Sequence, residues 1–325
     1  MGGGGVNSRA ATEKTGFQPR RPAGSVKPVN IAVIGDIHLM WDSTDIEFFN
    51  QSDYDHVLFV GDLPARDPGK VNDIAARLAE VNKSSFYMFG NHDAVTIPQL
   101  AAEVMQQQWL ISMGAMGMKG RVKKLVSHLG NVKVCGYNSY ALSDEVALVN
   151  MRPFAMGGFL SFHPYMKEAY GVATLADSEI KLRDLVDSVE QPKIVFMGHN
   201  GPHGLGKKPS DIWGVDFNRK GGDWGDTDYA FAIDYAKSCG KEVLVAVAGH
   251  MHHPTKYGKK KKAWHVEKEG VQYINAARYP RHERRGGVKY RHHVRIELTE
   301  KGAHVFRAEV DDAKHLNLSD DHAPF

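Results

Sequence analysis

The sequence predicts an α/β fold, a four-layer α/β/β/α sandwich in which two packed mixed sheets carry flanking helices. Two observations support this prediction. Short apolar runs rich in Val, Ile and Phe recur along the 325 residues and end at glycine, which is typical of strands buried on both faces. Segments with the apolar spacing of helices lie between several of these runs. The sequence contains no internal repeat.

The strands and helices follow from these patterns in chain order. Strands are expected at 30–35, 56–60, 85–89, 132–136, 193–197, 243–248, 271–276, 291–298 and 303–309. Helices are expected at 69–82, 97–108, 176–189 and 227–239. The third helix has apolar residues on one face and acids early in the segment, where they favour the helix dipole.

We expect one catalytic domain at residues 29–312, between a flexible N-terminal tail at 1–28 and a C-terminal tail at 313–325. The first 28 residues are rich in Gly, Pro and basic residues and are typical of a flexible tail, a trimmed targeting segment or a cloning artefact. Two irregular stretches, at 138–172 and 200–226, are candidate lids or substrate loops because long irregular segments in enzymes often have such roles.

Five of the apolar runs end in glycine followed by residues that can bind a metal or move a proton. They are Gly35-Asp36-Ile37-His38, Gly61-Asp62, Gly90-Asn91-His92-Asp93, Gly198-His199 and Gly249-His250-Met251-His252. In α/β sheets, ligands bind where loops leave the carboxyl ends of strands. Glycine at such an exit lets the backbone turn sharply and approach an ion. We therefore expect the five exits to converge on one site.

The candidate metal ligands at these exits are carboxylates, one amide and imidazoles, with no thiolate. They are Asp36, His38, Asp62, Asn91, His199, His250 and His252. This set suits Mn²⁺, Fe, Zn²⁺ or Co²⁺ and argues against a cysteine-rich structural zinc site. Seven ligands are too many for one tetrahedral ion, but suit two ions that share a carboxylate and lie roughly 3.5–4 Å apart. In extended backbone, alternate residues face one side, so each D-x-H or H-x-H pair can face one ion.

These motifs make the sequence resemble the calcineurin-like metallophosphoesterases. The D-x-H, GD, GNH-D/E, GH and GHxH patterns of that family occur in order at 36–38, 61–62, 90–93, 198–199 and 249–252. The resemblance covers most of the chain and implies the metallophosphoesterase fold, which is the same four-layer sandwich. The stretches GHNGPHGLG at 198–206, GGDWGD at 221–226 and INAARYPR at 274–281 also resemble a branch found in cyanobacteria and plants.

The resemblance also implies a role for each residue. It implies one metal held by Asp36, His38, Asp62 and His252, and a second held by Asp62, Asn91, His199 and His250. A hydroxide between the two ions would attack phosphorus in line, and His92, oriented by Asp93, would give a proton to the leaving group. Two ions lower the pKa of bound water and offset transition-state charge, and a histidine with a pKa of about 6.5 suits proton donation at neutral pH.

Each motif also has a simpler explanation. A single Gly-Asp after a strand is more often a turn or a helix cap, and a single His-x-His is more often solvated surface. The joint occurrence of all five motifs favours the metal site. His203 and His253 lie next to the motifs in sequence, and we expect them close to the site, where they would support ligands or touch substrate.

Arginines near the motifs are candidates for binding substrate phosphate, because a guanidinium binds phosphate oxygens in a bidentate fork. Arg66 has the offset of the phosphate-binding arginine in phosphoprotein phosphatases, but Ala65 replaces the aspartate before it, so a protein phosphatase is disfavoured. Arg278 and Arg281, within AARYPRHERRGG, are further candidates. A solvated loop is the alternative for this second segment.

Composition limits the partners and the compartment. The net charge of +3 is mild, so the chain is no general polyanion binder, and the basic run Lys259–Lys262 is expected on a solvated hairpin or loop. The two cysteines cannot form a disulfide framework, which fits a reducing compartment, cytoplasmic or plastid-like, rather than secretion. No apolar stretch approaches the roughly 20 residues that span a bilayer, so no membrane association is expected.

The sequence is compatible with three functions. The leading one is a dinuclear metal-dependent phosphoesterase acting on mono- or diesters of a small or nucleotide-like group. The second is a nuclease, which needs a continuous basic groove, of which the sequence offers only short segments. The third is a non-catalytic metal-binding scaffold, which the retention of every ligand and of His92 disfavours. The motifs do not define the native substrate or the oligomeric state.

Overall fold

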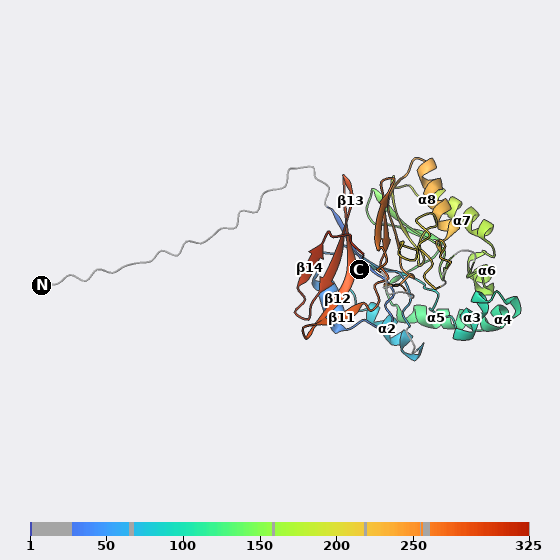
Figure 1. Cartoon of the computed structure of the whole chain (residues 1–325), viewed down its shortest axis with the longest axis horizontal. Coiled ribbons are helices and arrows are strands. Elements are labelled where there is room, and N and C mark those ends of the chain that lie inside the picture. The colour runs from blue at the N-terminus through green and yellow to red at the C-terminus, as the bar shows by residue number, and fades with distance from the viewer. Residues whose placement is uncertain are drawn as a thin grey trace.

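The computed structural model of the chain describes residue 1 and residues 28–64, 68–157, 160–217, 220–253, 255 and 261–324. In these residues two mixed sheets pack face to face and helices cover their outer faces (Figure 1). This arrangement confirms the predicted fold class. None of the helices in the described ranges has the length and apolar character that a bilayer span requires.

The first sheet has the strand order β14-β13-β12-β1-β2-β3-β4, with β11 paired to β12. Its strands are β1 (Val29–Ile34), β2 (His56–Phe59), β3 (Ser84–Met88), β4 (Lys133–Cys135), β11 (His282–Arg285), β12 (Val288–Thr299), β13 (Gly302–Val310) and β14 (Leu316–Ser319). Strands β1 to β4 run parallel, and the others pair antiparallel. Residues 316–319, within the segment expected as a C-terminal tail at 313–325, instead form β14 of this sheet.

The second sheet has the order β5-β6-β7-β8-β10-β9. Its strands are β5 (Asn138–Ala141), β6 (Val146–Asn150), β7 (Lys193–Met197), β8 (Glu242–Ala248), β9 (His265–Lys268) and β10 (Val271–Asn275). Strands β6, β7, β8 and β10 are parallel, whereas β5 and β9 pair antiparallel at the two edges. The irregular stretch expected at 138–172 is therefore wrong in its first part, which forms the β5–β6 hairpin.

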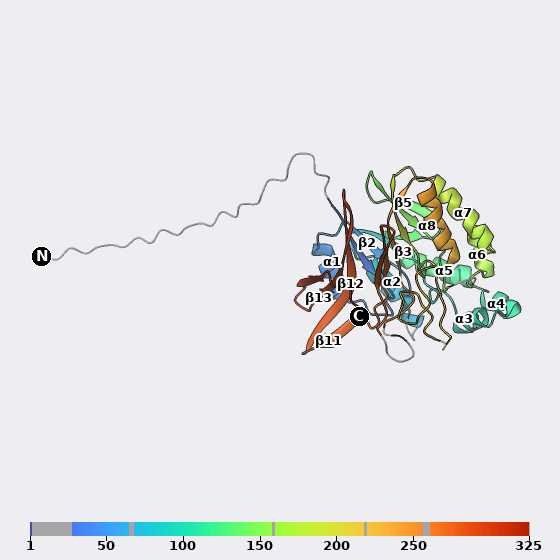
Figure 2. The same ribbon diagram turned by 45° about the horizontal axis from the view of Figure 1, so that its top comes forward.

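The helices form the two outer layers. They are α1 (Ser43–Gln51), α2 (Val71–Leu78), α3 (Ile97–Val104), α4 (Gln108–Gly114), α5 (Met118–His128), α6 (Pro164–Tyr170), α7 (Leu175–Asp187) and α8 (Thr227–Ser238), with a short 3₁₀ turn, η1 (Pro68–Lys70), before α2. The predicted helices correspond to α2, α3, α7 and α8. Figure 2 shows α1 on one side of the sheets, and α7 and α8 together on the other.

Helix α1, which we did not predict, begins at a capping box. The backbone N–H of Asp45 donates to the Asp42 carboxylate over 3.2 Å, and the N–H of Asp42 donates back to Asp45 over 3.1 Å. Such reciprocal bonds satisfy amides that a helix start leaves without partners. Phe48 and Phe49 then bury the inner face of the helix against the first sheet.

Alternating side chains of the central strands fill two separate apolar layers. In β1, Ile31 and Val33 belong to the layer between the sheets, whereas Ala32 and Ile34 belong to the layer beneath the helices. All four are fully buried. A strand that is buried on both faces reads as a continuous apolar run, which is why the sequence identified these strands reliably.

The run Lys259–Lys262 is only partly described, and its last member departs from expectation. Lys262 is buried, and its ammonium donates to the carbonyls of Pro209 and Gly214, each over 2.8 Å. Burial lowers the pKa of Lys262 to about 8. The expected solvated position is wrong for Lys262, because these carbonyls of the 200–226 segment replace water around its ammonium.

Candidate metal centre

The loops that leave β1, β2, β3, β7 and β8 bring the candidate ligands together. Because β1, β2 and β3 are parallel, as are β7 and β8, their carboxyl ends lie along one edge of each sheet. Two groups of candidate metal-binding atoms form there, each within 4.8 Å. One group is Asp36, His38 and His252, and the other is Asp62, His199 and His250. Each group draws residues from both sheets.

The first group has the spacing expected around one ion. The Nε2 atom of His252 lies 2.7 Å from Asp36 Oδ2 and 3.0 Å from His38 Nε2. The Nδ1–H of His38 donates to the Pro64 carbonyl over 2.6 Å, which leaves its Nε2 lone pair directed at the group. Two nitrogens that bind one ion at right angles, each about 2.1 Å from it, are about 3.0 Å apart.

The side-chain oxygen of Asn91 lies close to both imidazoles of the second group. This Oδ1 lies 3.0 Å from His199 Nε2 and 2.9 Å from His250 Nδ1. The Nδ1–H of His199 donates to the Val60 carbonyl over 2.6 Å, so its Nε2 faces the group. Asp62 Oδ2 is 3.5 Å from the same Nε2. Carboxylate, amide and imidazole donors therefore meet at one point, which is a chemically suitable environment for a divalent transition metal.

Several candidate ligands have backbone in the left-handed region, which L-residues rarely adopt. The φ angles are 43° for Asp36, 44° for His38, 53° for Asp62 and 68° for His250. Such strain costs on the order of 1–3 kcal/mol per residue and concentrates at functional sites. Its presence at four candidate ligands supports a functional rather than a purely structural role for these loops.

Two glycines at the strand exits leave room for the carboxylates. A Cβ on Gly90 would lie 2.2 Å from Asp62 Oδ1, and a Cβ on Gly249 would lie 2.3 Å from Asp36 Oδ1. Both distances are far below van der Waals contact. Gly90 and Gly249 are therefore required by the close approach of the acidic side chains.

Asp93 does not orient His92, contrary to the role that the family resemblance implied. Its buried carboxylate accepts hydrogen bonds from the backbone N–H groups of Gly90, Asp62 and Leu63 over 2.6–3.0 Å, and from the Tyr87 hydroxyl over 2.5 Å. These donors occupy both carboxylate oxygens. Asp93 therefore fixes the loop that carries Asp62. Burial and the nearby Asp62 charge raise the pKa of Asp93 to about 6.

The charges of the site favour a bound cation. Burial would raise the pKa of Asp36, but the hydrogen bond to His252 and the charges of His252 and His199 together outweigh this effect and lower the pKa to about 2. Burial would lower the pKa of His199, but the carboxylates of Asp62 and Asp36 raise it to about 10. These carboxylates thus hold protons on neighbouring imidazoles, and a metal ion between them would displace those protons.

His92 and Tyr279 lie at the exposed side of the site. The His92 side chain is exposed, and its ring meets the His38 ring edge to face with centroids 6.3 Å apart. Tyr279, which we did not predict, stacks on His252 at 5.0 Å and meets His38 edge to face at 5.2 Å. Its place in AARYPR, shortly after β10, is the sequence signal that could have identified it.

The predicted substrate-binding residues differ in their positions and contacts. His253 is buried in the wall of the site, with Nδ1 3.1 Å from the Lys262 carbonyl. His203 is largely exposed, with Nε2 3.9 Å from Asp223 Oδ2. Arg278 forms an ion pair of 2.6 Å with Glu283. Arg66 lies outside the described residues.

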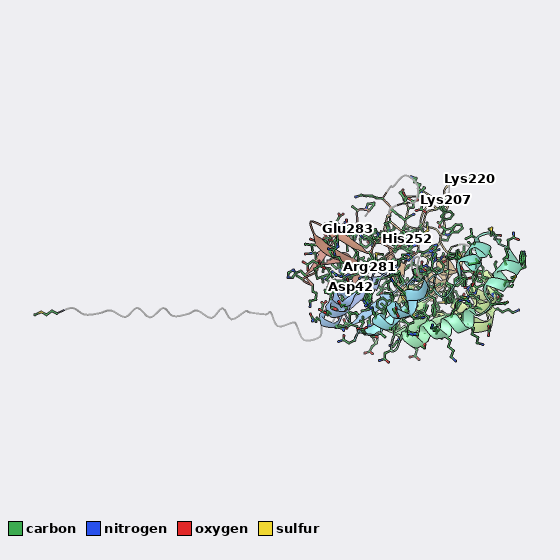
Figure 3. The ribbon with its side chains drawn as sticks, turned by 90° about the horizontal axis from the view of Figure 1, so that it is seen from below. Asp42, Lys207, Lys220, His252, Arg281 and Glu283 are labelled. Carbon is green, nitrogen blue, oxygen red and sulfur yellow. The ribbon has the colours of Figure 1, made fainter. Side chains whose placement is uncertain are left out.

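Arg281 is a structural residue, so its predicted contact with substrate phosphate is wrong. Its buried guanidinium pairs with Asp45 over 2.5 Å and donates to the Met40 carbonyl over 2.8 Å. Figure 3 shows Arg281 on the same side of His252 as Asp42 and Glu283. Lys207 and Lys220 lie on the opposite side of His252 in this view. Asp45 pairs with the guanidinium because a buried carboxylate requires a partner of opposite charge.

Replacing Arg281 with methionine is expected to lower the free energy of unfolding by about 3 kcal/mol, because Asp45 would keep a buried charge without its main partner. Urea denaturation at pH 7 measures the change. Arg284→Met, at an exposed position of the same hairpin, is the control and should stay within about 0.5 kcal/mol of the native protein. Equal stabilities for the two variants would contradict the structural assignment.

The pH dependence of this ion pair follows from the pKa of Asp45. Burial alone would raise that pKa, but Arg281 and His282 outweigh it and hold it below its ordinary value. A lowered carboxyl pKa stabilises the fold above the unfolded value of about 4, and this contribution is lost only as pH falls through the lowered pKa. The stability difference between native protein and Arg281→Met should therefore shrink in strong acid.

A third group of potential ligands, Asp42, Asp45 and His282, also lies within 4.8 Å. Its carboxylates are already paired with cations: Lys289 lies 2.6 Å and Arg291 2.9 Å from Asp42. Arg281 pairs with Asp45. These three cationic side chains balance the two acids, so a divalent ion would find no excess negative charge there. We assign this group to stability.

Two cavities of about 420 Å³ each flank the metal centre. One is lined by His250, His252 and Tyr279, together with Asp216 and Phe217 of the 200–226 segment. The other is lined by His92 and by residues around α3 and α5. A substrate phosphate at the centre would therefore have space on both sides.

Comparisons with known proteins place the chain in a family. No curated protein matches it. Similar solved structures include a Thermus thermophilus protein named TT1561, with 11% identity, 90% of this chain and 99% of that chain covered, and a TM-score of 0.46. They also include NAD nucleotidase of Haemophilus influenzae, with 11% identity, 90% and 53% covered, and a TM-score of 0.45. The family model for calcineurin-like phosphoesterases matches residues 29–254, a span that contains all five motifs, and the chain belongs to that family.

Proposed function

We propose that the protein is a dinuclear metal-dependent phosphoesterase that hydrolyses mono- or diesters of a small or nucleotide-like phosphate. The observation that carries this proposal is the meeting of two candidate ligand groups at one edge of the paired sheets. Membership of the family supports metal-dependent phosphoester hydrolysis in general. The related proposals are that the catalytic domain begins at residue 29 and extends past the expected boundary at 312 to include β14, and that the chain is related to the cyanobacterial and plant branch.

The proposed ligands divide between two ions that share one carboxylate. Asp36, His38, Asp62 and His252 would hold the first ion, and Asp62, Asn91, His199 and His250 would hold the second. Support comes from the 3.0 Å separation of the His38 and His252 Nε2 atoms and from the two imidazoles around Asn91 Oδ1. Mn, Fe, Zn and Co all suit this donor set.

The side chains have distinct tasks in the proposed reaction. Two ions held by these residues would supply an activated water and offset the negative charge on the phosphoryl oxygens. His92, exposed beside His38, would give its proton to the departing oxygen. Asp93 would keep Asp62 in place through its bonds to the loop amides. Tyr279 packs on His252 and would limit the motion of that imidazole.

The nuclease alternative receives less support. A nuclease needs a continuous basic surface that follows the nucleic-acid backbone. Of the basic segments noted in the sequence, Arg281 and Lys262 are buried, and Arg278 is paired with Glu283. These described residues therefore contribute little to such a surface.

Metal removal and readdition test the proposal. Protein stripped by a chelator should not hydrolyse bis(4-nitrophenyl) phosphate or 4-nitrophenyl phosphate. Added Mn²⁺ should restore hydrolysis of at least one ester, with two ions bound per chain at saturation. His282→Gln, in the third group of potential ligands, is the control and should still bind two ions. Two bound ions without hydrolysis of either ester would favour a scaffold instead.

A further inference from the structure

The cavity beside His92 has a predominantly apolar lining. It lies between the loop after β2, the start of α2, the loop after β3, the start of α3 and helix α5. Val71, Val95, Ile97 and Leu125 contribute apolar side chains from these elements. Pro64 and Pro98 add further apolar surface. None of the described residues that line it is an acid.

Five of the twelve lining residues are polar, namely Asn72, His92, Thr96, Arg121 and Lys124, and the hydrogen-bonding groups of some are already occupied. The Arg121 guanidinium donates to the Ala94 carbonyl over 2.7 Å and to the Met116 carbonyl over 3.0 Å. The first of these bonds holds the loop after β3 against helix α5. The exposed Lys124 adds one positive charge. A sugar or a base placed here would lose hydrogen bonds to water, whereas an alkyl or aryl group would gain from leaving water.

The cavity is next to the candidate metal centre, because His92 lines it and the His92 ring lies 6.3 Å from the ring of His38. His92, the proposed proton donor, lines it directly. Pro64 also lines it, and the Pro64 carbonyl accepts the hydrogen bond of His38 Nδ1. In an in-line displacement the leaving oxygen departs on the side of its proton donor. The group attached to that oxygen would therefore extend past His92 into this cavity.

We propose that this cavity binds the leaving group of the substrate, and that this leaving group is an apolar alcohol. The inference rests on the proposed function. In the reaction, water forms a new bond to phosphorus while the bond between phosphorus and the alcohol oxygen breaks. The alcohol oxygen takes the proton of His92, and the proton lost by water returns the imidazole to its acid form. The products are the alcohol and the phosphate, or the phosphate monoester when the substrate is a diester.

Straight-chain alkyl phosphates test the proposal, because their leaving alcohols share nearly the same pKa and differ only in apolar area. Ethyl, butyl and hexyl phosphate, each also as its methyl diester, should be compared by the release of the longer alcohol. We expect kcat/KM to rise about threefold for each added methylene until the cavity is filled. Glycerol phosphate, similar in length to butyl phosphate but polar, should react more slowly than butyl phosphate.

Substitutions within the cavity make the test specific. Val95→Thr adds a hydroxyl at nearly constant volume and should reduce the hexyl-to-ethyl ratio of kcat/KM several-fold. Ile97→Thr, at an exposed position of the same lining, provides a second variant if the first folds poorly. Ile180→Thr, at an exposed isoleucine of α7, is the matched control and should leave the ratio unchanged.

The possible outcomes separate this inference from the proposed function. Hydrolysis without a chain-length preference, faster reaction of glycerol phosphate, or a ratio that Val95→Thr and Ile97→Thr leave unchanged would overturn the inference and leave the phosphoesterase intact. Failure of every ester with two ions bound would overturn the proposed function itself. A chain-length preference that both cavity variants reduce would support the apolar leaving group.

Discussion

Replacing Asp62 with asparagine is expected to lower kcat/KM about a thousandfold, because Asp62 is the one carboxylate proposed to contact both ions. Loss of that shared ligand removes several kcal/mol of transition-state stabilisation, and each 1.4 kcal/mol or so corresponds to a factor of ten in rate. Asparagine keeps the size of the side chain, so the accepted bond from the His92 N–H to Oδ1 can persist. Steady-state kinetics at saturating Mn²⁺, with metal content measured in parallel, provide the test.

The control for this substitution is Asp73→Asn, which makes the same chemical change at an exposed position of α2. It should retain native activity and bind two ions. The Asp62 variant should bind fewer ions or bind them more weakly. A variant with native metal content and native kcat/KM would remove Asp62 from the proposed ligand set.

Replacing His92 with glutamine is expected to lower kcat by about 10²–10⁴-fold for an alkyl ester, because the departing alkoxide would lose its proton donor. The loss should be much smaller for a 4-nitrophenyl ester, since that anion leaves readily without a proton. Metal content should not change, because His92 belongs to neither candidate ligand group. Kinetics with both esters of the same class measure the difference.

His304→Gln, at an exposed histidine of β13, is the matched control for this change and should leave both rates native. An equal loss for alkyl and 4-nitrophenyl esters would argue that His92 binds or positions the phosphate instead. A loss of bound metal would indicate damage to the centre, and would contradict the assignment of His92 as proton donor alone.

The sequence motifs place the candidate ligands in loops that the structure brings together, because these loops follow strands that bury both faces. Such strands appear as unbroken apolar runs, and the glycines that end them are needed for the approach of Asp36 and Asp62. The positions of these residues could therefore be anticipated without knowledge of any long-range contact. Their assignment to two ions stays a prediction.

The roles of Asp93 and Arg281 depend on contacts that local sequence does not encode. Asp93 is adjacent to His92 in the chain, but its oxygens turn toward Tyr87 and the loop amides. Arg281 lies in the arginine-rich segment AARYPRHERRGG, but its partner Asp45 lies 236 residues earlier in the chain. Sequence patterns report which residue types are near a loop, whereas the partner of each charge is decided by tertiary packing.

The missed secondary structure has a similar cause. Strand β6 is buried along its whole length, but a polar stretch precedes it and its pairing with β7 is distant in sequence. Helix α5 has several lysines and only a narrow buried face, formed by Met118, Val122 and Leu125. Tertiary contacts stabilise both elements more than their own sequence periodicity does.

Each candidate ligand group joins residues of both sheets, and this has a consequence for the lifetime of the protein. Asp36 and His38 follow β1, whereas His252 follows β8 on the other sheet. An ion held by all three would link the loops of the two sheets to each other. A ligand that binds only the folded state raises the free energy of unfolding by mass action. The supply of metal would therefore control how long the protein stays folded as well as its catalytic rate.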